Sequence, residues 1–159
     1  IIWGQDAGFE VPEFRATLGD SVIGILTRTV FLPQVVQVKE VAGQVNTLYK
    51  AKTGNDLTGA SARSFTGLQA WVHVLEKAGS TDPAAIQKAA NDLNIPGAEL
   101  VVPWAGIKFS TAGNEIGQNT LGSGLIGQYQ KNANGEIVLE IVYPFDVASA
   151  DMVYPFPKF

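Results

Sequence analysis

The chain has 159 residues, of which 46% are hydrophobic and 16% charged, so it can bury a sizeable core and is not a disordered segment. Its net charge is -4 and its Lys and Arg residues are scattered singly, which excludes a nucleic-acid-binding surface. It contains no cysteine, which excludes disulfides and thiolate metal sites, and no apolar run reaches the length of a membrane span.

The chain opens on a short apolar stretch that ends in an acidic turn. Residues 1–3 are bulky and apolar and predict a buried strand, and Gly4 and Gly8 permit sharp turns on either side of Asp6. Ligands of open α/β sheets bind outside the carboxyl ends of strands, so Asp6 is a candidate contact for a cationic group. The alternative is that Asp6 caps a turn or the next helix. Because natural chains seldom begin inside a buried strand, we interpret Ile1 as the edge of a truncated piece.

A short helix and a second strand are predicted next. Residues 11–19 have Pro12 near the first helical position and Gly19 just past the end, as helices commonly do. Residues 22–31 are rich in β-branched and apolar side chains and predict a strand, which Pro33 prevents from continuing.

Three helices are predicted in the middle of the chain. The first spans residues 35–53 and ends at Gly54, and the second spans 61–78, where apolar residues surround most of the helix and predict burial against a sheet. The third begins at Asp82, an N-cap followed by proline, and runs to about Leu93. The apolar face expected for the first helix consists of Val38, Val41, Val45 and Leu48.

The last third of the chain predicts strands. Residues 106–109 form a short strand, a polar loop covers 110–120, and two strands meet at the hairpin signal Asn134–Gly135. Apolar residues alternate between the two faces of the strand after this turn, which predicts a half-buried β-ribbon or one at the edge of a sheet. Residues 144–159 contain two closely spaced prolines near their end and predict an extended tail.

Two sequence motifs fit a catalytic or cofactor-binding function poorly. Residues 122–127 match the G-x-G-x-x-G pattern of dinucleotide sites, but the following alternation predicts a strand where that fingerprint needs a helix. His73 is the only histidine and lies in an apolar helix, which favours a packed or surface-edge side chain over a base or metal ligand. We therefore expect no enzyme activity, no catalytic residues, no metal and no cofactor.

Four aromatic residues are candidate pocket walls. A ligand site combines apolar walls with a few polar groups, so aromatic side chains could line one. Most aromatic side chains instead belong to the core, and composition favours that interpretation here. The four residues are Trp3, Phe9, Phe65 and Trp71.

With these elements placed, the whole chain resembles the carboxyl-terminal portion of type I periplasmic solute-binding proteins of the branched-chain amino acid ABC transporter family. The signals are weak singly and fairly specific together, in order and with the right separations. They are Gly4-Gln5-Asp6-Ala7-Gly8, Ser61-Ala62-Arg63-Ser64-Phe65-Thr66-Gly67, Ala78-Gly79-Ser80-Thr81-Asp82-Pro83, Ile95-Pro96, Pro103-Trp104-Ala105-Gly106-Ile107-Lys108-Phe109, Gly117-Gln118-Asn119 and Tyr143-Pro144-Phe145-Asp146.

The resemblance implies part of a two-lobed α/β fold with Rossmann-like lobes and a carboxyl-terminal β-hairpin. Residues 1–22 would end a second-lobe segment, 23–124 would form a first-lobe segment with three helices, and 125–159 would return to the second lobe. It also implies a periplasmic protein that captures an amino acid or related small organic acid and delivers it to ABC permease subunits in the membrane.

The resemblance further implies where the ligand binds. Asp6 falls where amino-acid-binding members carry the acidic residue that meets the ligand's ammonium group, with Ala7 beside it, and Phe65 falls where an aromatic residue of the first lobe packs near the ligand. The groups that grip the ligand carboxylate come from the amino-terminal half, so we expect this chain alone to bind weakly or not at all. We also expect its stability to need a swapped dimer, another homo-oligomer or a retained partner fragment.

A second hypothesis comes from a different class of protein. A ligand-sensing domain of a receptor or regulator can be built on the same fold, and it predicts a transmembrane or signalling segment in the parent gene. A free binding protein predicts instead a signal peptide and a first α/β lobe upstream of Ile1.

Overall fold

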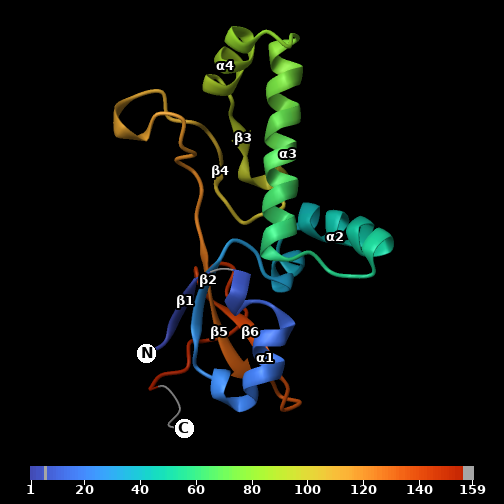
Figure 1. The fold of residues 1–159 in the computed structure, drawn as a ribbon, viewed down its shortest axis with the longest axis vertical. Helices are drawn as coiled ribbons and strands as arrows, with labels where there is room; N and C mark the ends of the chain where they lie inside the picture. The colour runs from blue at the N-terminus through green and yellow to red at the C-terminus, as the bar shows by residue number, and fades with distance from the viewer. Residues whose placement is uncertain (6, 156–159) are drawn as a thin grey trace.

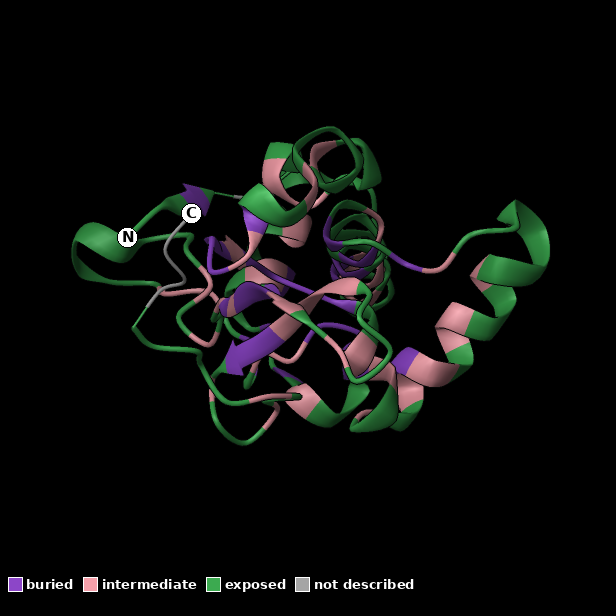
Figure 2. Ribbon diagram, turned by 90° about the horizontal axis from the view of Figure 1, so that it is seen from below, coloured by how far each residue is buried: buried purple, intermediate pink, exposed green. Residues whose placement is uncertain are grey.

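The computed structural model describes residues 1–5 and 7–155. The molecule is elongated, with a sheet and helix α1 at one end and helices α3 and α4 at the other (Figure 1). In Figure 2 the buried positions gather on the strands of the sheet, whereas the helix surfaces are mostly exposed or intermediate. The two ends are joined by the segments that follow β2 and precede β5 (Figure 1).

A four-stranded mixed sheet organises the lower end. Its strands are β1 (Trp3–Gln5), β2 (Leu26–Thr29), β5 (Leu125–Lys131) and β6 (Ile137–Tyr143), in the order β1-β2-β5-β6. Strand β1 is parallel to β2, whereas the β2–β5 and β5–β6 pairs are antiparallel. The sheet therefore contains two strands from the start of the chain and two from its end.

Helix α1 (Pro12–Leu18) carries the chain from β1 to β2, as the sequence predicts. Proline is accepted at its start because the first N–H groups of a helix have no partner within the helix. Gly19 follows the helix with a φ of 53°, a backbone conformation that residues other than glycine rarely adopt. The helix packs an aromatic cluster against the sheet, in which Phe14 lies between Phe9 and Tyr129.

The predicted β-hairpin is confirmed. The N–H of Asn132 donates to the carbonyl of Glu136 at 2.9 Å, and Gly135 in the turn has a φ of 80°. The ribbon that follows, β6, forms one edge of the sheet, which agrees with its alternating pattern.

The prediction of a buried opening strand is wrong. Ile1 is 87% exposed and Trp3 is 53% exposed, because β1 forms the other edge of the sheet and pairs only with β2 among the described residues. A buried strand needs neighbours on both sides and cover on its faces. Residues 1–3 are therefore apolar but remain more than half exposed in this chain.

Helix α2 (Glu40–Thr53) begins later than the pattern predicts, because residues 33–37 form the 3-10 helix Pro33–Gln37. The helix ends at Gly54, which has the expected left-handed conformation with a φ of 78°. The expected apolar face is wrong in part, since Val38 precedes the helix and Leu48 is 68% exposed. Ala42 is the buried residue of the helix.

Helix α3 (Gly59–Ala78) is the longest helix of the described chain, and it is not buried against a sheet. One face is buried and carries small or β-branched residues, whereas the large apolar residues lie on the opposite side and are exposed. The prediction of burial around the helix is therefore wrong, and Trp3, Phe65 and Trp71 are not core residues either. The buried residues are Gly59, Ala62, Thr66, Ala70 and Val74, and the exposed ones are Phe65, Leu68, Trp71 and Val72.

Helix α4 (Pro83–Asn91) packs beside α3 and begins as predicted, with the carboxylate of Asp82 accepting from the N–H of Ala85 at 3.0 Å. A small antiparallel pair follows, made of β3 (Ile95–Pro96) and β4 (Gly106–Ile107). The two strands lie close together, since a Cβ on Gly106 would lie 2.6 Å from the carbonyl oxygen of Ile95. The polar stretch 110–120 lies outside the named strands, as expected.

Two groups of buried side chains form the core. The larger group lies between the helices and the segments that join the two ends, where it includes Phe31 and Leu100, and it extends onto the sheet through Leu125 of β5 and Ile141 of β6. The smaller group lies between the sheet and α1, and it consists of Val22, Ile25 and Tyr129 with Phe9 and Phe14 against them.

Candidate functional site

The loop after β1 lies at the carboxyl end of the parallel β1–β2 pair. The chain turns into a 3-10 helix at Ala7–Phe9, and Ala7 is exposed. Strand β2 ends at Thr29, so its carboxyl end meets that of β1 at the same edge of the sheet. The other candidate residue of this loop, Asp6, lies outside the described residues.

The first turn of α3 approaches this edge. A Cβ on Gly59 would lie 2.9 Å from the Thr29 hydroxyl oxygen and 3.0 Å from Oε2 of Glu10, so only glycine lets the helix come this close without displacing a side chain. The carboxylate of Glu10 thus lies against the positive end of the helix macrodipole, which favours a negative charge. This edge joins the loop after β1, the end of β2 and the start of α3.

A reciprocal cap fixes the start of α3. The hydroxyl of Thr58 accepts from the N–H of Ser61 at 3.3 Å, and the hydroxyl of Ser61 accepts from the N–H of Thr58 at 2.8 Å. This capping box satisfies two backbone donors that the helix itself cannot pair. The position of the helix end beside Glu10 and Thr29 is therefore well defined.

Phe65 lies on the same helix but on a different face. It is six residues beyond Gly59, which corresponds to about 9 Å along the axis and about a third of a turn around it. Its ring is 39% exposed, so it can serve as an apolar contact for a molecule outside the described chain.

Glu10 is the residue that the sequence reasoning missed at this edge. Its carboxylate reaches Gly59, which is 49 positions away in the chain, and no local pattern signals such a contact. The available hint was a second acidic residue within the loop that follows a predicted strand.

The glycine-rich motif at residues 122–127 has the strand geometry that its sequence context predicts. Leu125, Ile126 and Gly127 belong to β5, so no helix follows the glycines. The physical basis of a dinucleotide fingerprint, a phosphate at a helix N-terminus, is therefore missing here.

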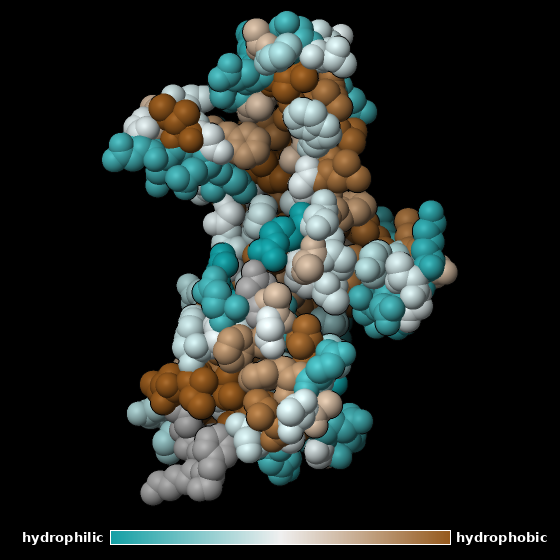
Figure 3. Space-filling model, in the orientation of Figure 1, coloured by the Kyte–Doolittle hydropathy of each residue, from teal (hydrophilic) through white to brown (hydrophobic). Residues whose placement is uncertain are grey.

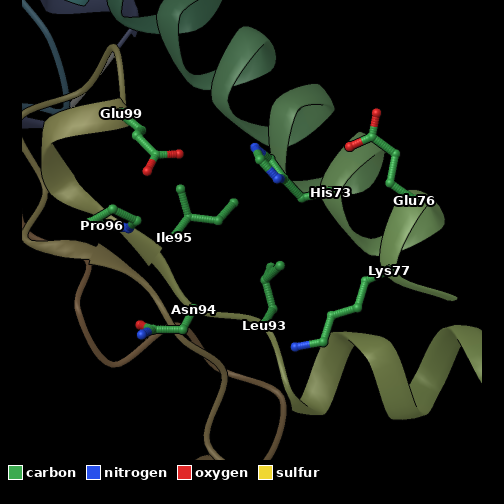
Figure 4. Close-up of a pocket in the computed structure, with 8 residues that line it drawn as sticks. All are labelled: His73, Glu76, Lys77, Leu93, Asn94, Ile95, Pro96 and Glu99. Atoms are coloured by element: carbon green, nitrogen blue, oxygen red, sulfur yellow. The ribbon is translucent and has the colours of Figure 1, made fainter.

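A hollow between α3 and the segment after α4 contains His73 (Figure 4). His73 and Lys77 project from α3 into the hollow, His73 toward the side of Ile95 and Glu99 and Lys77 toward Leu93. Lys77 donates to the carbonyl oxygen of Asp92, so its ammonium group is engaged in holding α4. The half-buried position of His73 agrees with the packed or surface-edge side chain that the sequence indicates.

The described residues bring no three His, Cys, Asp or Glu side chains together in a way that could hold a metal ion. Over the same residues, none of the helices is long and apolar enough to cross a membrane.

Comparison with known proteins identifies the fold. No family model and no curated protein matches the chain. A leucine-binding protein from Thermotoga maritima matches 91% of the chain with a TM-score of 0.64 and 23% identity, over 38% of its own length. A structure described as a branched-chain amino acid ABC transporter from Silicibacter pomeroyi matches 94% of the chain with a TM-score of 0.68 and 18% identity, over 39% of its length.

The chain therefore has part of the type I periplasmic-binding-protein fold. The likeness expected from the sequence is confirmed at the level of the fold, since both structures superpose on more than nine tenths of the chain. The chain spans about two fifths of the length of these solved structures.

Proposed function

We propose that this chain is the carboxyl-terminal portion of an extracytoplasmic solute-binding protein that captures an amino acid or related small organic acid for ABC-transporter uptake. The observation that carries the proposal is the fold likeness, which extends over 91% and 94% of the chain to the two solved structures. In this proposal the protein is periplasmic, works with membrane permease subunits and is a binding protein rather than an enzyme.

The proposed ligand-binding residues are Asp6, Ala7 and Phe65. The loop that carries Asp6 and Ala7 follows β1 at the edge where α/β folds bind ligands. In the proposal, the Asp6 carboxylate receives the ligand's ammonium group through a charge-assisted hydrogen bond, which a buried cation requires. Phe65 supplies an apolar contact from α3.

The proposed lobes follow the chain as 1–22, 23–124 and 125–159. One observation supports a two-part arrangement: the segments after β2 and before β5 join the two ends of the molecule (Figure 1). Strand β2 (Leu26–Thr29) falls within the proposed first-lobe segment but pairs with β1 and β5, so the chain leaves the sheet only after Thr29.

A thermal-shift screen of the complete protein that contains this chain tests the function. A ligand at 100 times its Kd stabilises the native state by about 2.7 kcal/mol, so at least one amino acid or small organic acid in a broad panel should raise the Tm. If no compound raises it, the uptake proposal fails.

Site variants in the complete protein test the residues. Asp6→Asn should weaken binding of the stabilising amino acid at least about tenfold, since it removes the charged acceptor. Glu13→Gln removes an exposed carboxylate from α1 and should leave the affinity unchanged. Equal affinities for Asp6→Asn and the unmodified protein would remove Asp6 from the site.

A further inference from the structure

A second hollow lies beside the segments that join the two ends of the molecule. It contains the glycine-rich stretch that begins at Gly122, together with one cationic side chain, that of Arg28, and one aromatic side chain. No carboxylate is among its lining residues, so its charge is positive. The lining residues are Arg28, Trp104, Asn119, Gly122, Ser123 and Gly124.

Arg28 lies on β2 and is half-buried. Its guanidinium makes no hydrogen bond and no ion pair with any residue in the described part of the chain. A guanidinium offers five N–H donors in a planar fork that fits an oxyanion, and removing such a cation from water is costly without a partner. The hollow therefore contains a cationic donor that has no acceptor among the described residues.

Backbone donors lie at the same hollow. The hydrogen bonds of the described chain use none of the N–H groups of Gly122, Ser123 and Gly124. A Cβ on Gly124 would lie 3.0 Å from Nε of Arg28, so glycine is what allows the arginine to lie directly against this backbone. Unpaired backbone N–H groups beside a guanidinium are a common way to bind an anion.

The remaining polar groups hold the hollow in shape. Oδ1 of Asn119 accepts from the N–H of Lys108 at 3.0 Å and from the N–H of Leu121 at 3.1 Å. Its Nδ2 donates to the carbonyl of Gly106 at 3.1 Å, so this side chain fixes the loop and has no free oxygen to repel an anion. The indole N–H of Trp104 is buried and has no acceptor among the described residues.

We propose that this hollow is a binding site for the carboxylate group of a small organic acid, with Arg28 as its principal contact. Phosphate shares the oxyanion chemistry, but the hollow has one cationic side chain, which matches the single charge of a carboxylate. The site uses none of Asp6, Ala7 and Phe65, so it stands or falls separately from the proposed amino-acid site.

The test uses the complete protein that contains this chain, because the 159-residue chain alone is expected to associate. The Asp6→Asn variant is the background, so that the proposed amino-acid site contributes little to binding. Acetate, inorganic phosphate and the neutral analogue acetamide are titrated at constant ionic strength, and the heat of binding is measured by calorimetry.

Acetate should give a saturable change, and acetamide should not. Arg28→Gln in the same background should weaken acetate binding at least about tenfold, because hydrogen bonds to charged groups are the strong ones. Lys52→Gln removes a cation from the last turn of α2 and should have no effect. Circular dichroism of each variant shows whether it is folded.

A second variant covers the case in which Arg28→Gln does not fold. Gly124→Ala keeps the charge but places a methyl group where the guanidinium lies, so it should also weaken acetate binding. No saturable response to acetate, or equal affinities for acetate and acetamide, would overturn the site. Tighter binding of phosphate than of acetate would overturn its assignment to a carboxylate, and unchanged affinity in a folded arginine variant would remove Arg28.

Discussion

Tyr129 shows how single side chains hold the sheet to α1. The residue lies on β5 with a fully buried side chain, and its hydroxyl donates to the carbonyl oxygen of Phe9 at 2.7 Å. It also packs against Phe14, at a ring separation of 6.0 Å. Because Phe9 precedes α1 and Tyr129 lies near the other end of the sequence, this contact joins the beginning of the chain to its end.

Replacing Tyr129 with phenylalanine should cost about 1 kcal/mol in the free energy of unfolding at neutral pH, since the carbonyl of Phe9 loses its donor. Urea denaturation measures this change. Tyr143→Phe is the matched control, because Tyr143 is 51% exposed and its hydroxyl makes no hydrogen bond within the described chain. An equal loss in both variants would contradict the role of the Tyr129 hydroxyl.

The same residue predicts a loss of stability in alkali. Burial raises the pKa of Tyr129 above its ordinary value, so the unfolded chain releases this proton at a lower pH than the folded chain does. The contribution of the buried, protonated Tyr129 to stability is therefore fully present below a pH of about 10, the pKa of tyrosine in the unfolded chain. It is lost as the pH rises from there through the higher pKa of the folded state. Tyr129→Phe should reduce the alkaline decline in a series of urea titrations, and an unchanged decline would contradict this assignment.

At the scale of elements, α3 determines how the two ends of the molecule meet. Its buried face carries small residues such as Ala62 and Ala70, which let the helix approach its neighbours closely. Its first turn meets the edge of the sheet at Gly59, beside Thr29 and Glu10. The capping box at Thr58 therefore stabilises the helix at the end that bounds the candidate site.

Thr58→Ala should lower the free energy of unfolding by about 1 kcal/mol, the usual effect of removing an N-cap side chain. Ser64→Ala is the matched control, because Ser64 is an exposed residue of the same helix and makes no hydrogen bond through its side chain within the described chain. Chemical denaturation followed by circular dichroism measures both variants. The prediction fails if the cap variant is no less stable than the control.

At the scale of the whole molecule, two areas of exposed apolar surface bear on association. One is the exposed side of α3, and the other is the start of β1, where Ile1 and Trp3 lie at the sheet edge. Figure 3 shows apolar surface at both ends of the molecule. A helix that is apolar on two sides is typical of a buried helix, and an uncovered edge strand is a template for pairing with another chain.

We therefore expect the 159-residue chain to associate rather than to behave as a well-folded monomer. Size-exclusion chromatography with light scattering should give a mass above the 16.9 kDa of one chain. The double variant Leu68→Lys/Trp71→Lys adds charge to the exposed side of α3 and should shift the population toward the monomer. Leu48→Lys, at an exposed position of α2, should shift it less, and a folded monomer of the unmodified chain would contradict the expectation.

Local sequence signals predicted the ends of elements well. Pro12, Gly54, the Asp82 cap and the Asn134–Gly135 turn act through backbone preferences that depend on adjacent residues only. The strand geometry of residues 125–127 also followed from the local alternation. These features do not depend on which residues of the rest of the molecule pack against them.

The sequence by itself determined the order of the four α-helices of the described chain and of the strands of the main sheet, the hairpin and the exclusion of the dinucleotide fingerprint, but not strand β3. Only the tertiary structure decided which apolar residues are buried and which polar groups meet. Leu68 and Trp71 have core composition yet are exposed, while Glu10 meets Gly59 and Arg28 meets Gly124 across long separations in the chain. The reason is physical: caps and turns depend on neighbouring residues along the backbone, whereas burial and contact depend on what the rest of the molecule places nearby.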